Sequence, residues 1–170
     1  MTIRKILTEP DSCLRQKSIN VETVDDDIRT LMDDMLETMY SAPGIGLAAI
    51  QVGVPKRVIV IDLSKDGEKK NPQYFVNPKI ITNSDTEASY EEGCLSVPGQ
   101  FAEISRPDKC KVKFLNYNGE ESTLEAEGLL ATCIQHEMDH LEGILFIDYL
   151  SKLKKSMIVK KLSKASRIVV

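Results

Sequence analysis

The chain has few of the residues and segments that identify common protein classes. Its 170 residues include only two histidines, and no apolar run approaches the length of a membrane-spanning helix. Its cysteines, Cys13, Cys94, Cys110 and Cys133, form neither a CxxC pair nor a dense framework, so a disulfide scaffold is not expected. Because no apolar segment near Met1 is long enough for a secretory signal, we expect a cytoplasmic protein with free thiols.

The overall charge argues against a nucleic-acid-binding protein. The formal net charge is −4, and 42% of the residues are hydrophobic and 28% charged, as in ordinary globular proteins. No specific DNA partner is therefore expected. We find no internal repeat, low-complexity tract or linker, so we expect one catalytic domain that spans residues 1–170.

The spacing of apolar residues predicts two helices in the body of the protein. The first covers residues 25–40, where isoleucine, leucine and methionine residues recur on one face and Pro43-Gly44 closes the helix. We expect this methionine-rich stripe to be core. The second covers residues 128–141, contains both histidines and ends at Gly143.

Strands are predicted between these helices. Residues 57–63 form a buried strand, and residues 74–81 form another that Pro78 interrupts. Alternating residues over 109–117 and 121–127 indicate a hairpin, in which Asn118-Gly119 is expected to form a type I′ turn.

The C-terminal segment is strongly basic. Residues 151–170 hold seven Lys or Arg residues and no acidic residue, while Leu150, Leu153, Met157, Leu162 and Ala165 recur at helical spacing. A basic amphipathic helix is therefore expected. It could pack on the body with its basic face in water, contact ribosomal RNA electrostatically, or lie on a membrane surface.

Both histidines belong to one HExxH sequence, His136-Glu137-Met138-Asp139-His140. On a helix, residues i and i+4 project from the same face, so the two imidazoles can bind one metal ion. Glu137 would then lie beside a bound water and could act as a general base.

A catalytic metal site usually has three protein ligands and one open position. Because the chain has no third histidine, the remaining ligand has to be a thiolate or a carboxylate. The metzincin pattern fails at Phe146, where that family needs histidine, and no acidic residue follows Asp148 to serve a thermolysin-like site. The two common peptidase designs therefore lack their third ligand.

Cys133 and Cys94 differ as candidates for this ligand. Cys133 is three residues before His136 but seven residues, about 10 Å along the helix axis, from His140, so we interpret it as a core residue that lines a pocket. Cys94 lies in the segment 91–99, where glycine and proline break regular structure around the thiol. From the residues alone, Cys94 is either the third ligand or an inert structural cysteine.

Three segments together resemble the signature motifs of the peptide deformylases. They are Gly44-Ile45-Gly46-Leu47-Ala48-Ala49-Ile50-Gln51, Glu92-Gly93-Cys94-Leu95-Ser96 and Gln135-His136-Glu137-Met138-Asp139-His140-Leu141. The resemblance implies an α+β fold in which strands and hairpins wrap around a central HExxH helix, with a C-terminal amphipathic helix. It also implies that Cys94, His136 and His140 bind the metal and that Glu137 is the catalytic acid and base. The Gln51 side chain and the Leu95 N–H group would stabilise the oxyanion.

The same resemblance implies the reaction and the ion. The family removes the formyl group from N-formylmethionyl peptides and nascent chains, and it is associated with Fe²⁺, with Ni²⁺ or Co²⁺ as working substitutes and Zn²⁺ usually poorer. Without the resemblance, the residues alone favour zinc as the bound ion, because affinity and availability often favour it. We expect Ile45, Gly46, Leu129 and Cys133 to contact the substrate, and we expect Glu92 to pair with Arg106 and brace the turn that bears Cys94.

Two other functions share some of these features. A metallopeptidase that cuts internal amides would use Glu137 and both histidines, but it predicts a carboxylate or a third imidazole at the metal. A metal sensor or structural site predicts four protein ligands, yet no further cysteine or histidine lies near the other three in the sequence.

Overall fold

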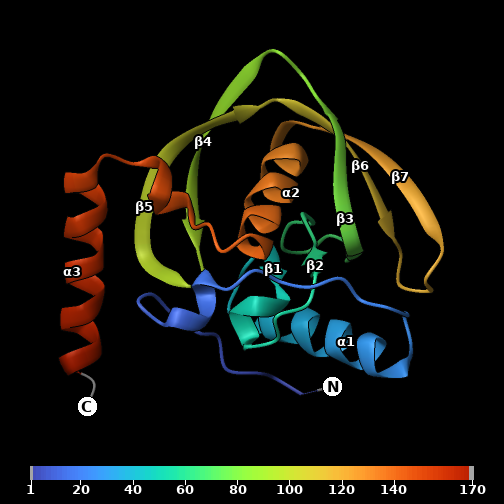
Figure 1. Ribbon diagram of the computed structural model, residues 1–170, viewed down its shortest axis with the longest axis horizontal. Coiled ribbons are helices and arrows are strands. Elements are labelled where there is room, and N and C mark those ends of the chain that lie inside the picture. Colours follow the sequence, from blue (N-terminus) through green and yellow to red (C-terminus); the bar gives the residue numbers. More distant parts are fainter. Residues whose placement is uncertain (1, 169–170) are drawn as a thin grey trace.

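The computed structural model describes residues 2–168, which form an α+β fold (Figure 1). In chain order the elements are η1 (Ser12–Arg15), α1 (Asp26–Ser41), β1 (Gly46–Ala48), η2 (Ala49–Val52), β2 (Val58–Ile61), β3 (Gln73–Asn83), β4 (Glu87–Cys94), β5 (Val97–Pro107), β6 (Lys109–Leu115), β7 (Glu121–Glu127), α2 (Gly128–Leu141), η3 (Phe146–Tyr149) and α3 (Lys152–Ile168), where η denotes a 3-10 helix.

The strands form two antiparallel sheets. One has five strands in the order β1-β2-β3-β6-β7, and the other is the two-stranded ribbon β4-β5. In Figure 1, α2 lies at the centre between this ribbon and the larger sheet, while α1 lies below it. The expected α+β class, with strands around a central helix, is confirmed.

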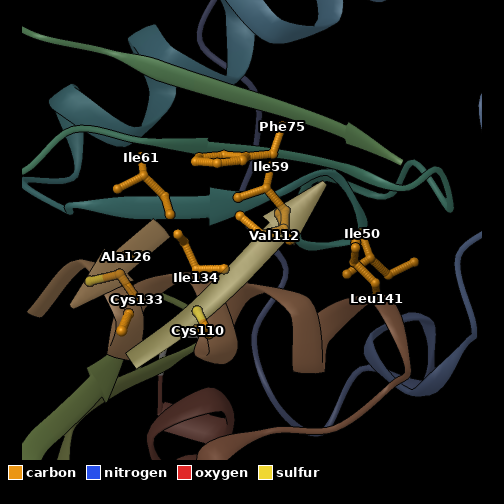
Figure 2. Close-up of a cluster of buried hydrophobic side chains, with 12 residues drawn as sticks. Ile50, Ile59, Ile61, Phe75, Cys110, Val112, Ala126, Cys133, Ile134 and Leu141 are labelled. Atoms are coloured by element: carbon orange, nitrogen blue, oxygen red, sulfur yellow. The ribbon is translucent and has the colours of Figure 1, made fainter. Parts of the chain in front are cut away.

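The central helix is held by a buried apolar cluster (Figure 2). Ile134 and Leu141 of α2 are almost fully buried, as are Ile59 of β2 and Phe75 of β3, which belong to the same cluster. Strand β2 is buried on both faces, which explains why it reads as a continuous apolar run. This packing fixes the rotation of α2 about its axis and therefore the direction in which its histidines point.

Helix α1 begins and ends within one residue of its predicted bounds. Asp25 caps its first turn, because the Asp25 carboxylate accepts a hydrogen bond of 3.0 Å from the backbone N–H of Ile28. Met32, Met35 and Met39 are fully buried against β2, so the methionine stripe is core, as predicted.

Two details of the predicted strands concern irregular backbone. The predicted interruption at Pro78 is present as a break in the pairing register and not as the end of the strand: the register shifts between Val76 and Lys79, Asn77 takes a φ of +51°, and β3 continues to Asn83. A proline can occupy such a bulge, where the ladder requires no N–H donor from it.

The loop between β6 and β7 is not a type I′ turn. That turn needs positive φ at both central residues, whereas here Gly119 has a φ of +82° and Asn118 does not take a positive value. Instead, the Asn116 side-chain oxygen accepts hydrogen bonds from the backbone N–H groups of Asn118 and Glu120, both at 3.0 Å. The Asn116 side chain therefore stabilises a loop that is longer than a two-residue turn and that has Gly119 near its end.

The C-terminal helix is present, but its predicted apolar face is partly wrong. Leu162 is buried in a cluster with Phe146 of η3, and Ile158 and Val159 pack against that cluster. Leu153 is 71% exposed and Met157 is 51% exposed, so both lie outside the packed face. The side chain of Ala165 lies outside the described part of the structure. Among the residues described, no helix combines the length and apolar character needed to cross a membrane.

Candidate metal centre and substrate cavity

The two histidines project from one face of α2 toward a cysteine on a different element. Cys94 ends β4, at the point where the β4–β5 pairing shifts register. The Cys94 sulfur lies 3.3 Å from Nε2 of His140, and one ligand atom from each of Cys94, His136 and His140 lies within 4.8 Å of the others. The structure thus brings together all three of the residues expected at the metal.

This donor set fits a transition-metal ion. In a tetrahedral site with bonds of about 2.0–2.3 Å, sulfur and nitrogen ligands lie about 3.5 Å apart, close to the observed separation of Cys94 and His140. Thiolate and imidazole donors favour transition metals over Mg²⁺ or Ca²⁺. No carboxylate belongs to the group of ligand atoms found in the described residues, which contradicts the site expected of the alternative metallopeptidase.

The electrostatic surroundings support the same conclusion. Burial lowers the pKa of His140 well below its usual value, so its ring is neutral and can offer a lone pair. Burial would also lower the pKa of His136, but its hydrogen bonds with Cys94 and Glu92 raise that pKa to about 10. The negative groups that stabilise a proton on His136 would equally stabilise a cation.

A buried ion pair orients His136. Its Nδ1 atom lies 2.8 Å from Oε1 of Glu92, so that Nδ1–H donates to the carboxylate and leaves Nε2 for a metal. Glu92 in turn receives two hydrogen bonds from Arg106, from Nε at 2.7 Å and from Nη2 at 3.0 Å. The side chains of Glu92 and Arg106 are only 5% and 6% exposed. The expected Glu92–Arg106 pair is therefore present in the interior.

Glu137 lies at the bottom of the site beside Gly46. A methyl group on Gly46 would come within 2.7 Å of the Glu137 Oε1 atom, so the absence of a side chain there makes room for the carboxylate. Burial raises the pKa of Glu137 to about 7, and its Oε2 atom has no hydrogen-bond partner among the described residues. A carboxylate with such a pKa can both accept and return a proton near neutral pH.

Gln51 and the Leu95 turn border the ligand group on another side. The Gln51 side-chain oxygen accepts a hydrogen bond of 2.9 Å from the backbone N–H of Ala48, which fixes the orientation of the amide. Its Nε2 atom donates to the Ser96 hydroxyl oxygen at 3.0 Å and lies 3.5 Å from the Cys94 sulfur. The two N–H groups of the Gln51 amide are therefore directed at the Ser96 hydroxyl and the Cys94 sulfur, so the amide lies beside the ligand group.

A cavity of about 450 Å³ opens onto these groups. The predicted substrate contacts Ile45, Gly46, Leu129 and Cys133 all line it, together with Gln51, Leu95, His136 and Glu137. Cys133 is 8% exposed and is not part of the ligand group, whereas Ile45 and Leu129 are 43% exposed at its rim. An apolar side chain bound here would lie next to the candidate metal position.

Some residues that complete the site were not identified from the sequence. Ser96 is fully buried and holds the Gln51 amide, although it belongs to a motif that the sequence displays. Phe146 stacks on His136 with ring centroids 6.1 Å apart, and Asp139 accepts a hydrogen bond from Arg106. No spacing in the sequence links Asp139 with Arg106. Phe146, in contrast, occupies the position of the third metzincin histidine, which is a sequence signal that its side chain lies near the two histidines.

Comparison with known proteins identifies relatives over the whole chain. The family model described as polypeptide deformylase matches residues 3–156. The chain is 67% identical to a peptide deformylase of Pelagibacter ubique, covering 100% of both proteins, and 62% identical to one of Phenylobacterium zucineum, covering 98% of this chain and 99% of the relative. The crystal structure of a peptide deformylase from Ehrlichia chaffeensis in complex with actinonin has a TM-score of 0.94 at 46% identity, covering 98% of this chain and 99% of that one.

Proposed function

This chain belongs to the polypeptide deformylase family, and we propose that Cys94, His136 and His140 hold its catalytic metal ion while Glu137 serves as the acid and base. The protein is a metallohydrolase that removes the N-formyl group from the initiator methionine of nascent polypeptides and releases formate. The observation that carries the residue assignment is the convergence of one thiol and two imidazoles beside a buried carboxylate.

When bound, a divalent ion supplies Lewis acidity toward water and toward the formyl oxygen. We infer that this ion is Fe²⁺ in the cell, because the family to which the chain belongs is associated with iron. Ni²⁺, Co²⁺ and Zn²⁺ are compatible substitutes, because a thiolate and two imidazoles are suitable ligands for all of them. Anaerobic purification followed by elemental analysis tests the inference. Stoichiometric zinc without iron in that preparation would contradict it.

Glu137 moves the proton in the proposed reaction. Its carboxylate accepts a proton as water attacks the formyl carbon, and it gives that proton to the amine nitrogen as the carbon–nitrogen bond breaks. The products are formate and a free methionine amine. A pKa of about 7 allows both transfers at neutral pH, and such acid–base catalysis typically contributes about 10²–10⁴-fold to the rate.

The amide of Gln51 and the backbone N–H of Leu95 are proposed to stabilise the negative oxygen that forms during attack. Gln51 suits this role because Ala48 and Ser96 hold its amide in one orientation. Loss of one such donor typically costs about 3 kcal/mol in transition-state stabilisation.

The methionine side chain is proposed to occupy the apolar part of the cavity. Ile45, Leu129 and Cys133 supply apolar surface there, and Gly46 allows the substrate backbone to approach Glu137. A formyl site of restricted size would discriminate against an acetyl group, because one extra methyl group changes the free energy of transition-state binding by about 1–3 kcal/mol.

Two substitutions test the residue roles. In Glu137→Ala, metal content should remain at the wild-type level while formate release from formyl-Met-Ala falls by about 10²-fold or more. Its matched control is Glu125→Ala, an exposed glutamate on β7. Retained turnover in Glu137→Ala would eliminate Glu137 as the base.

For the thiol, Cys94→Ser should weaken or exchange the metal, and Cys13→Ser serves as its control. Unchanged metal content and activity in Cys94→Ser would remove Cys94 from the site. Product analysis of the wild-type protein acting on formyl-Met-Ala separates deformylation, which yields formate and Met-Ala, from cleavage of the internal amide, which yields formylmethionine and alanine.

We further propose that residues 1–170 form one catalytic domain that acts in the cytoplasm, with α3 as a contact to the ribosome. The support is electrostatic: α3 is rich in lysine, and Lys160 and Lys161 are both exposed. Double charge reversal at Lys160 and Lys161 should reduce co-sedimentation with ribosomes at low salt and should leave formate release unchanged. Unaltered co-sedimentation would contradict the ribosome contact.

A further inference from the structure

The short turn between α2 and α3 contacts the proposed metal ligand His136 at its first residue, and it contacts Asp139 and Arg106 at its last residue. This turn is η3, Phe146–Tyr149. Phe146 stacks on the His136 ring at an interplanar angle of 26°. Tyr149, three residues later, donates a hydrogen bond of 2.7 Å from its hydroxyl to Oδ2 of Asp139, and its ring lies 5.1 Å from the guanidinium carbon of Arg106.

A continuous series of hydrogen bonds connects the Tyr149 hydroxyl to His136. The Asp139 oxygen that accepts from Tyr149 also accepts from Nη1 of Arg106 at 2.8 Å. Arg106 donates to both oxygens of Glu92, and Glu92 accepts from Nδ1–H of His136 at 2.8 Å. No link in this series is longer than 3.0 Å.

Tyr149 occupies the end of the series that is nearest to solvent. The Asp139 side chain is 20% exposed, whereas those of Arg106 and Glu92 are 6% and 5% exposed. Without the hydroxyl, the Asp139 carboxylate can turn toward water, and Arg106 then loses a partner for Nη1. Burial and the bond to Asp139 raise the pKa of Tyr149 to about 12, so the hydroxyl remains a donor over the working pH range.

We propose that Tyr149 is a positioning residue for the metal ligand His136, acting through Asp139, Arg106 and Glu92. The inference rests on the metal site of the proposed function and extends it to a residue that touches neither metal nor substrate. Removing the hydroxyl should allow the His136 ring to rotate, so the ion should leave more readily.

The test uses full-length protein loaded with Co²⁺, in which visible absorption reports the ligand geometry. In Tyr149→Phe, which keeps the ring, we expect Co²⁺ to be lost to a chelator about three- to tenfold faster than from wild type. Direct partners of metal ligands typically contribute about 10–100-fold, and Tyr149 is further from the metal than these. The absorption spectrum should shift, and kcat should fall while KM for formyl-Met-Ala stays unchanged. The matched control is Tyr117→Phe, whose hydroxyl donates to Asp33 at 3.1 Å and which does not line the cavity.

A double-mutant cycle establishes the route. If Tyr149 acts through Asp139, the Tyr149→Phe change should have little additional effect on Co²⁺ loss in an Asp139→Asn background. Additive effects would reject this route. A rate and spectrum in Tyr149→Phe equal to those of Tyr117→Phe would overturn the proposal, while formate release by wild-type protein would leave the proposed function intact. A wild-type protein that fails to bind Co²⁺ would refute the metal site itself.

Discussion

The contact between Gly46 and Glu137 gives a sensitive test of the catalytic geometry. Gly46 begins β1 and pairs with Ile61 of β2, so its backbone is extended and an alanine can adopt the same conformation. The methyl group of Gly46→Ala would nevertheless lie 2.7 Å from Oε1 and 3.2 Å from Cδ of Glu137. The substitution therefore acts on the proposed base without altering a charged or polar group.

The size of the effect follows from this distance. Non-bonded heavy atoms pack at about 3.5 Å, so the Glu137 carboxylate has to move by about 0.8 Å. A misplacement of about 1 Å in an active site can cost about 10²-fold in rate. We expect kcat of Gly46→Ala to fall about tenfold or more. Overpacking should also reduce the free energy of unfolding by about 1–3 kcal/mol.

The assay measures formate release, metal content and thermal unfolding on the same preparations. Metal content should stay at the wild-type level, because the three atoms nearest to the new methyl group all belong to Glu137 and not to a proposed metal ligand. Gly44→Ala provides a comparison: its methyl group would meet a Leu95 side-chain carbon, also at 2.7 Å, and it should change KM more than the acid–base step. Wild-type kcat in a folded, metal-loaded Gly46→Ala protein would refute the proposed position of Glu137.

Three further predictions concern stability. Replacing Arg106 with leucine leaves the Glu92 carboxylate buried without its partner and should cost about 3–5 kcal/mol in urea unfolding, whereas loss of less than 1 kcal/mol would contradict the buried ion pair. Gly143→Ala should destabilise the protein by at least about 1 kcal/mol, since Gly143 has a φ of +75° and its methyl group would lie 2.5 Å from a backbone oxygen; an unchanged melting temperature would contradict this. The backbone N–H of Thr2 and the Arg4 guanidinium hold the pKa of Asp34 below its usual range. These contacts therefore stabilise the fold at pH values above the pKa of unfolded Asp34, near 4, and the stabilisation is lost as the pH falls through the lower pKa of Asp34 in the folded protein. Asp34→Asn should flatten the acid side of the pH–stability curve, and an unaltered slope would contradict this.

The elements that the sequence predicts best are those with a strong local period. Helix α2 begins and ends at the predicted residues, because its apolar residues repeat at helical spacing and Gly143 follows with positive φ. The same period places His136 and His140 on one face before any tertiary contact is known. The β6–β7 hairpin was predictable from alternation, but its turn was not, because the Asn116 side chain stabilises a loop that the Asn-Gly signal does not describe.

Side-chain contacts between distant segments could not be derived in this way. The packed face of α3 is set by the cluster around Phe146 and Leu162, and this choice leaves Met157 in water although it shares the helical spacing. Tyr149 gives a similar example. Its contact with Asp139 depends on how η3 returns along α2, and no period in the sequence records that path.

Cys94 shows what tertiary structure adds to the chemistry of the site. Elimination of residue types left a thiolate or a carboxylate as the third ligand. The residues next to Cys94 in the sequence could not decide whether it is that ligand or an inert structural cysteine. The β4–β5 register shift turns the chain directly at Cys94, while the buried Glu92–Arg106 pair attaches the same strand to His136. The brace and the thiol are thus two residues apart on one strand. Any displacement of β4 would move both the ligand Cys94 and Glu92, the residue that orients His136. The geometry of the metal centre therefore depends on β4 as a unit.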